Sequence, residues 1–177
     1  MLDLNTTYTE KFVASGELAA YAEAHAHVLA RCQAGEERYA DSQGWLEVDE
    51  WAGPAVLDRT ERLAAELRAI ADTFVIIGVG GSNNSARAVI KALRPNGARI
   101  VYAGNTLSAH ELNGVLAELE GHDVVIDCIA KNFETLEPGS SFRLLRQYLV
   151  GRYGKEEAAH RIVCTGTIGS PLEELCR

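Results

Sequence analysis

The stretch from Val75 to Arg87 decides the fold, and it reads VIIGVGGSNNSAR. It begins with a continuous apolar run, which is typical of a strand buried on both faces of a parallel sheet. The glycines allow a tight turn and let a ligand approach the backbone N–H groups closely. The stretch therefore predicts a strand, a loop and the N-terminus of a helix, where unpaired N–H groups and the helix dipole favour a phosphate.

Outward from this stretch, the chain alternates between strand and helix patterns. Four short apolar runs predict strands, at residues 74–79, 100–102, 124–129 and 162–164. Apolar residues at helical spacing lie between these runs and predict connecting helices. Such alternation indicates βαβ units, so we expect an α/β fold with a doubly wound parallel sheet, in a flavodoxin-like sandwich.

The N-terminal part of the chain lacks this alternation. Apolar residues at helical spacing predict one amphipathic helix over about residues 16–34, and an irregular segment follows it. We therefore expect an N-terminal helical and irregular extension at residues 1–53 and an α/β domain at residues 54–177. Within that domain, Ser108 and Glu111 have the spacing of a capping box, and residues 131–138 read as a loop.

Composition and charge exclude several classes of partner. The formal net charge is −8 and no block of basic residues occurs, so we expect neither nucleic acid nor an anionic membrane as a partner. No apolar run reaches membrane-spanning length, and the N-terminus lacks the features of a signal peptide. The four cysteines have no paired spacing and are expected to be reduced, which favours a cytoplasmic location. No metal-ligand pattern is present, so we predict no metal and no other cofactor.

The glycine-rich loop allows more than one interpretation. A dinucleotide site would need a third glycine where this chain has Asn83, and a carboxylate after the next strand, where Ala103, Gly104 and Asn105 follow instead. A nucleoside-triphosphate loop would need Gly-Lys-Ser/Thr, which is absent from the stretch. The sequence thus favours the phosphate of another small molecule, while a tight turn without any ligand remains open.

Four segments resemble the glucose-6-phosphate isomerase family in their order and spacing. They are Gly44–Leu46, Ile77–Ser82, Gly104–Ser108 and Ile129–Pro138. The resemblance extends over about residues 16–177 and implies the first sugar-isomerase (SIS) domain of that family. It further implies a glycolytic and gluconeogenic enzyme that interconverts glucose 6-phosphate and fructose 6-phosphate without a cofactor.

The resemblance also implies which residues bind the substrate. In the family, the sugar phosphate is held by the Ser of the Gly-Gly-Ser loop and by hydroxyls of a Ser-Lys-Ser/Thr loop. The matching phosphate-binding residues in this chain are Gly81, Ser82, Lys131, Asn132 and Thr135. The second loop departs from the family: Ala130 and Asn132 stand where the family has hydroxyl residues, and Glu134 and Leu136 replace threonines. An unliganded second loop therefore stays open.

No catalytic residue is expected within these 177 residues. The family's general base, acid, Lys and Arg lie beyond the position that matches Arg177, and so does the fifth strand of the domain. We therefore expect a sheet that is incomplete on its C-terminal side and no isomerase activity from this chain alone. Three explanations remain: a fragment of a longer enzyme, a non-catalytic sugar-phosphate-binding module or sensor, or a chain that pairs with the missing C-terminal half. A homodimer is a further expectation.

Overall fold

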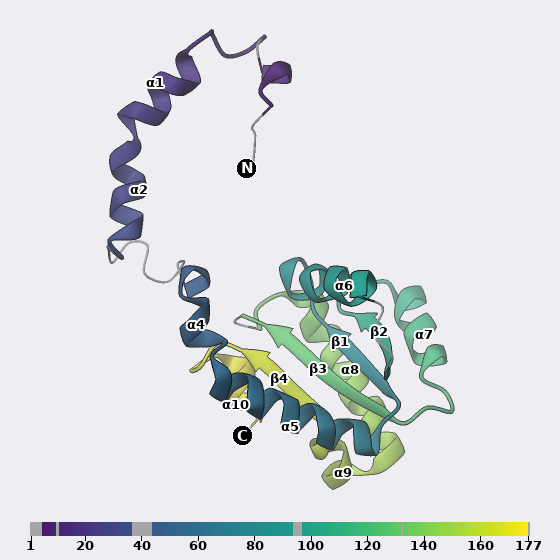
Figure 1. Ribbon diagram of the computed structural model, residues 1–177. Helices are drawn as coiled ribbons and strands as arrows, with labels where there is room; N and C mark the ends of the chain where they lie inside the picture. The colour runs from purple at the N-terminus through teal and green to yellow at the C-terminus, as the bar shows by residue number, and fades with distance from the viewer. Residues whose placement is uncertain (1–4, 10, 37–43, 94–96, 132, 177) are drawn as a thin grey trace. The chain divides into compact units, whose positions relative to one another are not determined.

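The computed structural model describes residues 5–9, 11–36, 44–93, 97–131 and 133–176. These residues divide into two compact units, Met1–Thr60 and Glu61–Arg177, and helix α5 (Pro54–Ile70) runs across the division. Figure 1 shows the elements of both units. The boundary that the sequence suggests, between residues 53 and 54, stays a prediction. No helix in the described residues is long and apolar enough to cross a membrane.

The first unit is helical. Its elements before α5 are η1 (Thr7–Thr9), α1 (Glu17–Ala24), α2 (Ala26–Gln33), η2 (Gly44–Leu46) and α4 (Val48–Trp51). The single helix expected over residues 16–34 is thus interrupted at His25, whose φ of −107° and ψ of 8° are not helical. The His25 Nδ1 lies 2.8 Å from the carbonyl oxygen of Tyr21, and its ring stacks on the Tyr21 ring at 3.9 Å. The same Tyr21 carbonyl also accepts the backbone N–H of His25 at 3.0 Å, so His25 closes the last turn of α1.

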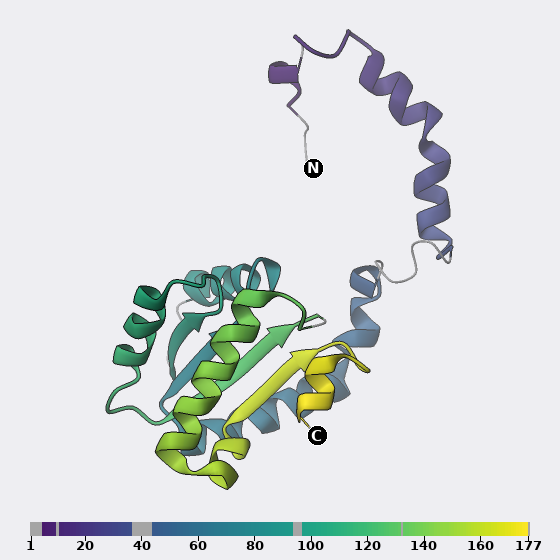
Figure 2. The same ribbon diagram turned by 180° about the vertical axis from the view of Figure 1, so that it is seen from behind.

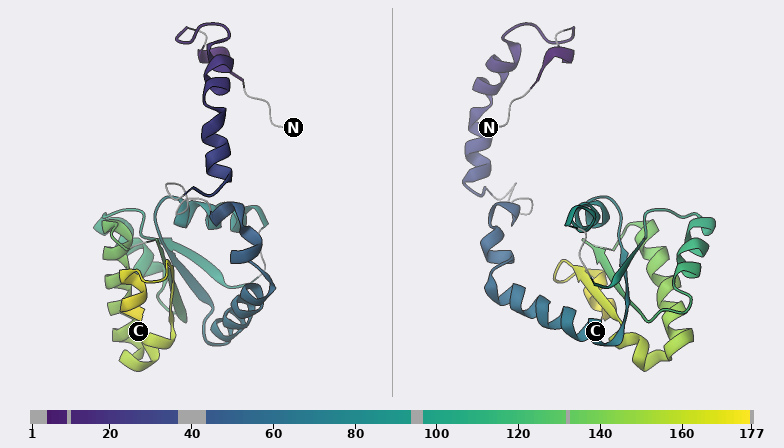
Figure 3. Two further views of the ribbon diagram at one scale, coloured as in Figure 1. Left: turned by 90° about the vertical axis from the view of Figure 1, so that its left-hand side faces the viewer. Right: turned by 45° about the vertical axis from the view of Figure 1, so that its right-hand side comes forward.

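The second unit contains a four-stranded, all-parallel, open sheet. Its strands are β1 (Thr73–Ile77), β2 (Arg99–Ala103), β3 (Val124–Ala130) and β4 (Ile162–Gly166), in the order β2-β1-β3-β4. The helices that follow them are α6 (Gly81–Leu93), α7 (Ala109–Glu118), α8 (Leu136–Tyr153), α9 (Lys155–His160) and α10 (Pro171–Cys176). The expected doubly wound α/β fold is confirmed, because helices cover both faces of the sheet (Figure 3).

The main hydrophobic core lies on the face that carries α7, α8 and α10. Figure 2 shows α8 and α10 across this face. Alternate strand residues point into it, among them Val75, Ile77, Val101, Val124, Ile126 and Cys128. Phe142, Leu145 and Leu149 on α8 meet them and are almost fully buried, as their helical spacing predicts. Each such buried side chain stabilises the fold by about 1.5–3 kcal/mol.

Helix α8 begins earlier than the sequence suggests. Residues 131–138 were expected to form a loop, but α8 starts at Leu136 and includes Pro138 as its third residue. A proline is tolerated there because the first N–H groups of a helix have no intrahelical acceptor. Helix α9 was not anticipated, since its six residues are too few for a periodic pattern.

The capping box at α7 is half formed. Ser108 Oγ accepts a hydrogen bond from the Glu111 N–H at 3.4 Å, as expected. The N–H of Ser108 itself, however, donates to Thr106 Oγ1 at 3.0 Å. Thr106 therefore takes the place that the Glu111 carboxylate would have in a complete box.

Candidate functional site

The glycine loop joins β1 to α6 by three residues, Gly78 to Gly80. The N–H of Gly78 donates to the carbonyl of Ala103 at 3.0 Å, which ties the loop to the end of β2. A Cβ on Gly78 would lie 3.1–3.2 Å from atoms of Ser82, so the loop is pressed against the first turn of α6. Gly80 has a φ of +58°, a conformation that glycine adopts without strain.

The first turn of α6 presents backbone N–H groups beside this loop. The N–H groups of Asn83 and Asn84 donate to the carbonyl of Gly80 at 3.2 and 2.8 Å. Gly81 and Ser82 precede them, at positions where helical geometry provides no acceptor. Gly81 is exposed and Ser82 is half-buried. This arrangement offers an anion two N–H groups, one hydroxyl and the positive end of a helix dipole.

The loop from Lys131 to Thr135 leaves the neighbouring strand at the same edge of the sheet. The strand register pairs Ile77, the last residue of β1, with Cys128, and β3 continues beside the glycine loop as far as Ala130. Helices α6 and α8 then leave toward opposite faces, as a comparison of Figures 1 and 2 shows. This is a topological switch point, where ligands of doubly wound sheets bind.

Gly104 brings three segments together at this edge. A Cβ on Gly104 would lie 2.9 Å from the backbone nitrogen of Gly78 and 3.2 Å from Cα of Pro138. The ends of β1 and β2 and the first turn of α8 are therefore in direct contact. Gly104 also has a φ of +83°, which favours glycine.

Phe133 anchors the second loop to α8. Its φ of +60° is the one positive value for a non-glycine residue in the described part of the chain. The Phe133 ring meets the Phe142 ring edge-on, with centroids 5.6 Å apart. The guanidinium of Arg143 lies 5.4 Å from the Phe133 centroid, and its Nη1 donates to the carbonyl of Gly139 at 2.9 Å. These contacts hold a strained backbone, a feature that clusters at ligand sites.

The structure locates four of the five predicted site residues. Gly81 and Ser82 lie in the first turn of α6, and Lys131, directly after β3, is exposed. Thr135 is the N-cap residue of α8, with an exposed side chain that makes no capping hydrogen bond. Asn132 lies outside the described residues. Both loops lie at one edge, but no hydrogen bond in the described residues joins the Ser82 side to Lys131 or Thr135. Their assembly around one ligand therefore stays a prediction.

The departures from the family's second loop lie in different surroundings. Ala130, where the family has a serine, is 8% exposed and belongs to the main core. Glu134 is exposed on the loop. A carboxylate near a phosphate opposes its binding unless it is turned away or paired with a cation.

Two polar residues near this edge have surroundings that the sequence did not predict. Asn83 is almost fully buried in the first turn of α6, and its Nδ2 donates to the carbonyl of Gly78. Asp127 lies on β3, and Thr165 Oγ1 donates to its Oδ1 at 3.1 Å. Burial raises the pKa of the Asp127 carboxyl to about 6, while the hydrogen bond from Thr165 opposes part of that rise. A carboxylate inside an apolar run was the available signal for Asp127.

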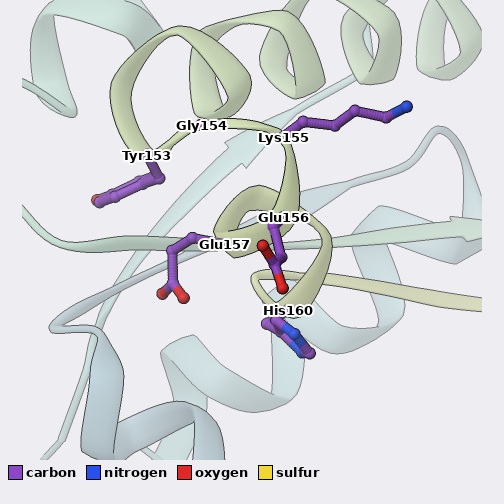
Figure 4. A pocket seen from close by; sticks show the side chains of 6 residues that line it. All are labelled: Tyr153, Gly154, Lys155, Glu156, Glu157 and His160. Carbon is purple, nitrogen blue, oxygen red and sulfur yellow. The ribbon is translucent and has the colours of Figure 1, made fainter.

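A separate open pocket lies at the junction of α8 and α9 (Figure 4). It is lined by Tyr153, Gly154, Lys155, Glu156, Glu157 and His160. This junction precedes β4, at the opposite edge of the sheet from the two loops. Within the described residues, no group of three or more His, Cys, Asp and Glu side chains could hold a metal ion.

Comparison with curated proteins finds relatives that share one name. The chain is 34% identical over 136 residues to a glucose-6-phosphate isomerase of Shouchella clausii, and the match covers 71% of this chain. It is 37% identical over 133 residues to one of Symbiobacterium thermophilum, over 69% of this chain. The matches span 30% of each relative's own length. No protein-family model matches the chain.

Comparison with solved structures finds chains of similar fold. A crystal structure of a hypothetical protein from Thermus thermophilus superposes with a TM-score of 0.73, covering 99% of this chain and 41% of that one. At 22% sequence identity, this likeness shows the fold alone. A glucose-6-phosphate isomerase from Chlamydia trachomatis superposes with a TM-score of 0.58 at 28% identity, covering 68% of this chain and 24% of that one.

Proposed function

Because the chain is related in sequence to the glucose-6-phosphate isomerase family over most of its length, we propose that it is a sugar-phosphate-binding part of such an isomerase. The complete enzyme would interconvert glucose 6-phosphate and fructose 6-phosphate. The observation that carries this proposal is the set of relatives with that name at 34–37% identity. The resemblance of four ordered segments further suggests that this part is the first sugar-isomerase domain.

The phosphate group is proposed to bind at the glycine loop. The N–H groups of Gly81 and Ser82 and the Ser82 hydroxyl are suited to donate to phosphate oxygens, because all are donors at the positive end of α6. Lys131 would add a full positive charge from the second loop, and Thr135 a hydroxyl. Asn132 would supply an amide in place of a family hydroxyl. No cofactor enters this proposal.

Binding and orientation are the part of catalysis that we assign to this chain. Isomerisation moves a proton between adjacent carbons, which needs a general base, and ring opening needs an acid. By resemblance, these groups belong to a part of the family that these 177 residues do not match. A fixed phosphate orients the reacting carbons toward such groups, and orientation by itself lowers the barrier substantially.

A second candidate function is a non-catalytic sugar-phosphate sensor or binding module. It is favoured by the second loop, where Ala130 is a buried core residue and Glu134 replaces a hydroxyl. Under either candidate, we expect a cytoplasmic protein whose partners are a sugar phosphate and either a second copy or a polypeptide that supplies the remaining domain.

Calorimetric titration of the 177-residue chain with 6-phosphogluconate tests the proposal. Ser82→Ala and Lys131→Ala should each weaken binding by about tenfold, because each removes a charge-assisted hydrogen bond to phosphate. Lys91→Ala is the matched control, since Lys91 is exposed in the last turn of the same helix. Equal affinities for all three variants and the parent chain would place any binding site elsewhere.

A further inference from the structure

We propose that Asn83 is the positioning residue of the glycine loop, an inference that rests on the proposed phosphate site. Asn83 is the third residue of α6 and its side chain is 2% exposed. Its Nδ2 donates to the carbonyl oxygen of Gly78 at 3.2 Å, so the helix reaches back across the loop to its first residue. The side chain touches the loop rather than a ligand.

This hydrogen bond fixes the orientation of one peptide group in the loop. In a planar trans peptide, the carbonyl of Gly78 and the N–H of Val79 point in opposite directions. When Asn83 holds that carbonyl toward itself, the N–H of Val79 is held away from α6. The peptides from Gly78 to Ser82 are thereby restricted to one arrangement before a ligand arrives, which reduces the entropy lost on binding.

One atom of the Asn83 side chain lowers the stability of the fold. Its Oδ1 is buried and has no hydrogen-bond partner within the described part of the chain. A buried acceptor without a partner destabilises a fold, whereas an apolar side chain of similar shape does not. An apolar side chain would avoid this cost, but it would leave the buried carbonyl of Gly78 without the hydrogen bond from Asn83.

Replacement by leucine distinguishes a role of Asn83 in positioning the loop from a role in packing. Asn83→Leu keeps the branched shape but removes the hydrogen bond, and Asn84→Leu makes the same change at the next, exposed residue of the helix. Each full 177-residue variant is titrated with 6-phosphogluconate, its thermal midpoint Tm is measured, and loop order is followed by the heteronuclear NOE of the Gly80 and Gly81 amides. Should Asn83→Leu fail to fold, Asn83→Ala and Asn84→Ala give the same comparison.

The proposal predicts that Asn83→Leu weakens binding by about tenfold and lowers the NOE of the loop amides relative to Asn84→Leu. Affinity and NOE equal to those of Asn84→Leu would overturn it. So would a loss of affinity that comes with a lower Tm and unchanged loop order, since that result marks a packing residue. If the parent chain does not bind 6-phosphogluconate, the phosphate site itself fails, and the NOE comparison still decides whether Asn83 orders the loop.

Discussion

At the scale of single residues, Asp127 makes the fold sensitive to pH. Burial raises its pKa from 3.8 to about 6, so ionising it disfavours the folded state. This loss of stability is absent below pH 3.8, where the carboxyl is protonated in both the folded and the unfolded protein. It grows as the pH rises and is complete above about 6. Its upper value is about 3 kcal/mol.

We therefore predict that Asp127→Asn stabilises the protein at pH 8 and has little effect at pH 4. An asparagine oxygen can still accept the hydrogen bond that Thr165 donates to Asp127. Urea unfolding of both proteins at the two pH values measures the difference. Asp58→Asn, which changes an exposed carboxylate, is the control. A stabilisation that is the same at pH 4 and pH 8 would contradict the raised pKa.

Two glycines of the same unit should respond to alanine in opposite directions. Gly104 has a φ of +83°, and an added Cβ would lie 2.9 Å from the nitrogen of Gly78. Gly104→Ala should therefore destabilise the unit by about 2–4 kcal/mol. Gly114 lies inside α7 with nothing within 4 Å of such a Cβ, so Gly114→Ala should stabilise it by about 1 kcal/mol. Chemical denaturation decides, and a neutral Gly104→Ala would refute the close contact between the loops.

At the scale of elements, the start of α7 depends on one hydroxyl. Ser108 Oγ accepts the N–H of Glu111, which otherwise has no acceptor in the first turn. Ser108→Ala should lower the free energy of unfolding by about 1 kcal/mol. Ser108→Asp should retain most of the stability because a carboxylate caps as well as a hydroxyl. If aspartate is as damaging as alanine, the capping interaction is not the cause.

Some of these elements could be predicted from the sequence and others could not. The four strands were predictable because strands buried on both faces carry unbroken apolar runs, and the glycine loop because its backbone needs residues without side chains. The start of α8 was not, since Pro138 reads as a loop residue until its place in the first turn is known. The roles of Asn83 and Asp127 were not predicted because each depends on burial and on a hydrogen-bond partner, Gly78 or Thr165, that the sequence does not reveal.

At the scale of the whole molecule, the chain is similar to only part of the isomerases, and an activity assay can test what that part does. The matches span 30% of the curated relatives, and the resemblance implies that the family's base lies outside these 177 residues. We predict that the purified 177-residue chain does not convert fructose 6-phosphate to glucose 6-phosphate. The Shouchella clausii enzyme, assayed under the same conditions, is the positive control. Turnover that copurifies with the chain would contradict the assignment of a binding role alone.

Phosphate binding at the edge where β1 and β3 end is the central claim about this protein. The most direct measurement is an amide NMR titration of the 177-residue chain with 6-phosphogluconate. We predict that the Gly81 and Ser82 amides shift first and farthest, because their N–H groups lie at the positive end of α6. Amides at the pocket of Tyr153 to His160 should stay in place. Unmoved Gly81 and Ser82 amides at millimolar ligand would contradict the account.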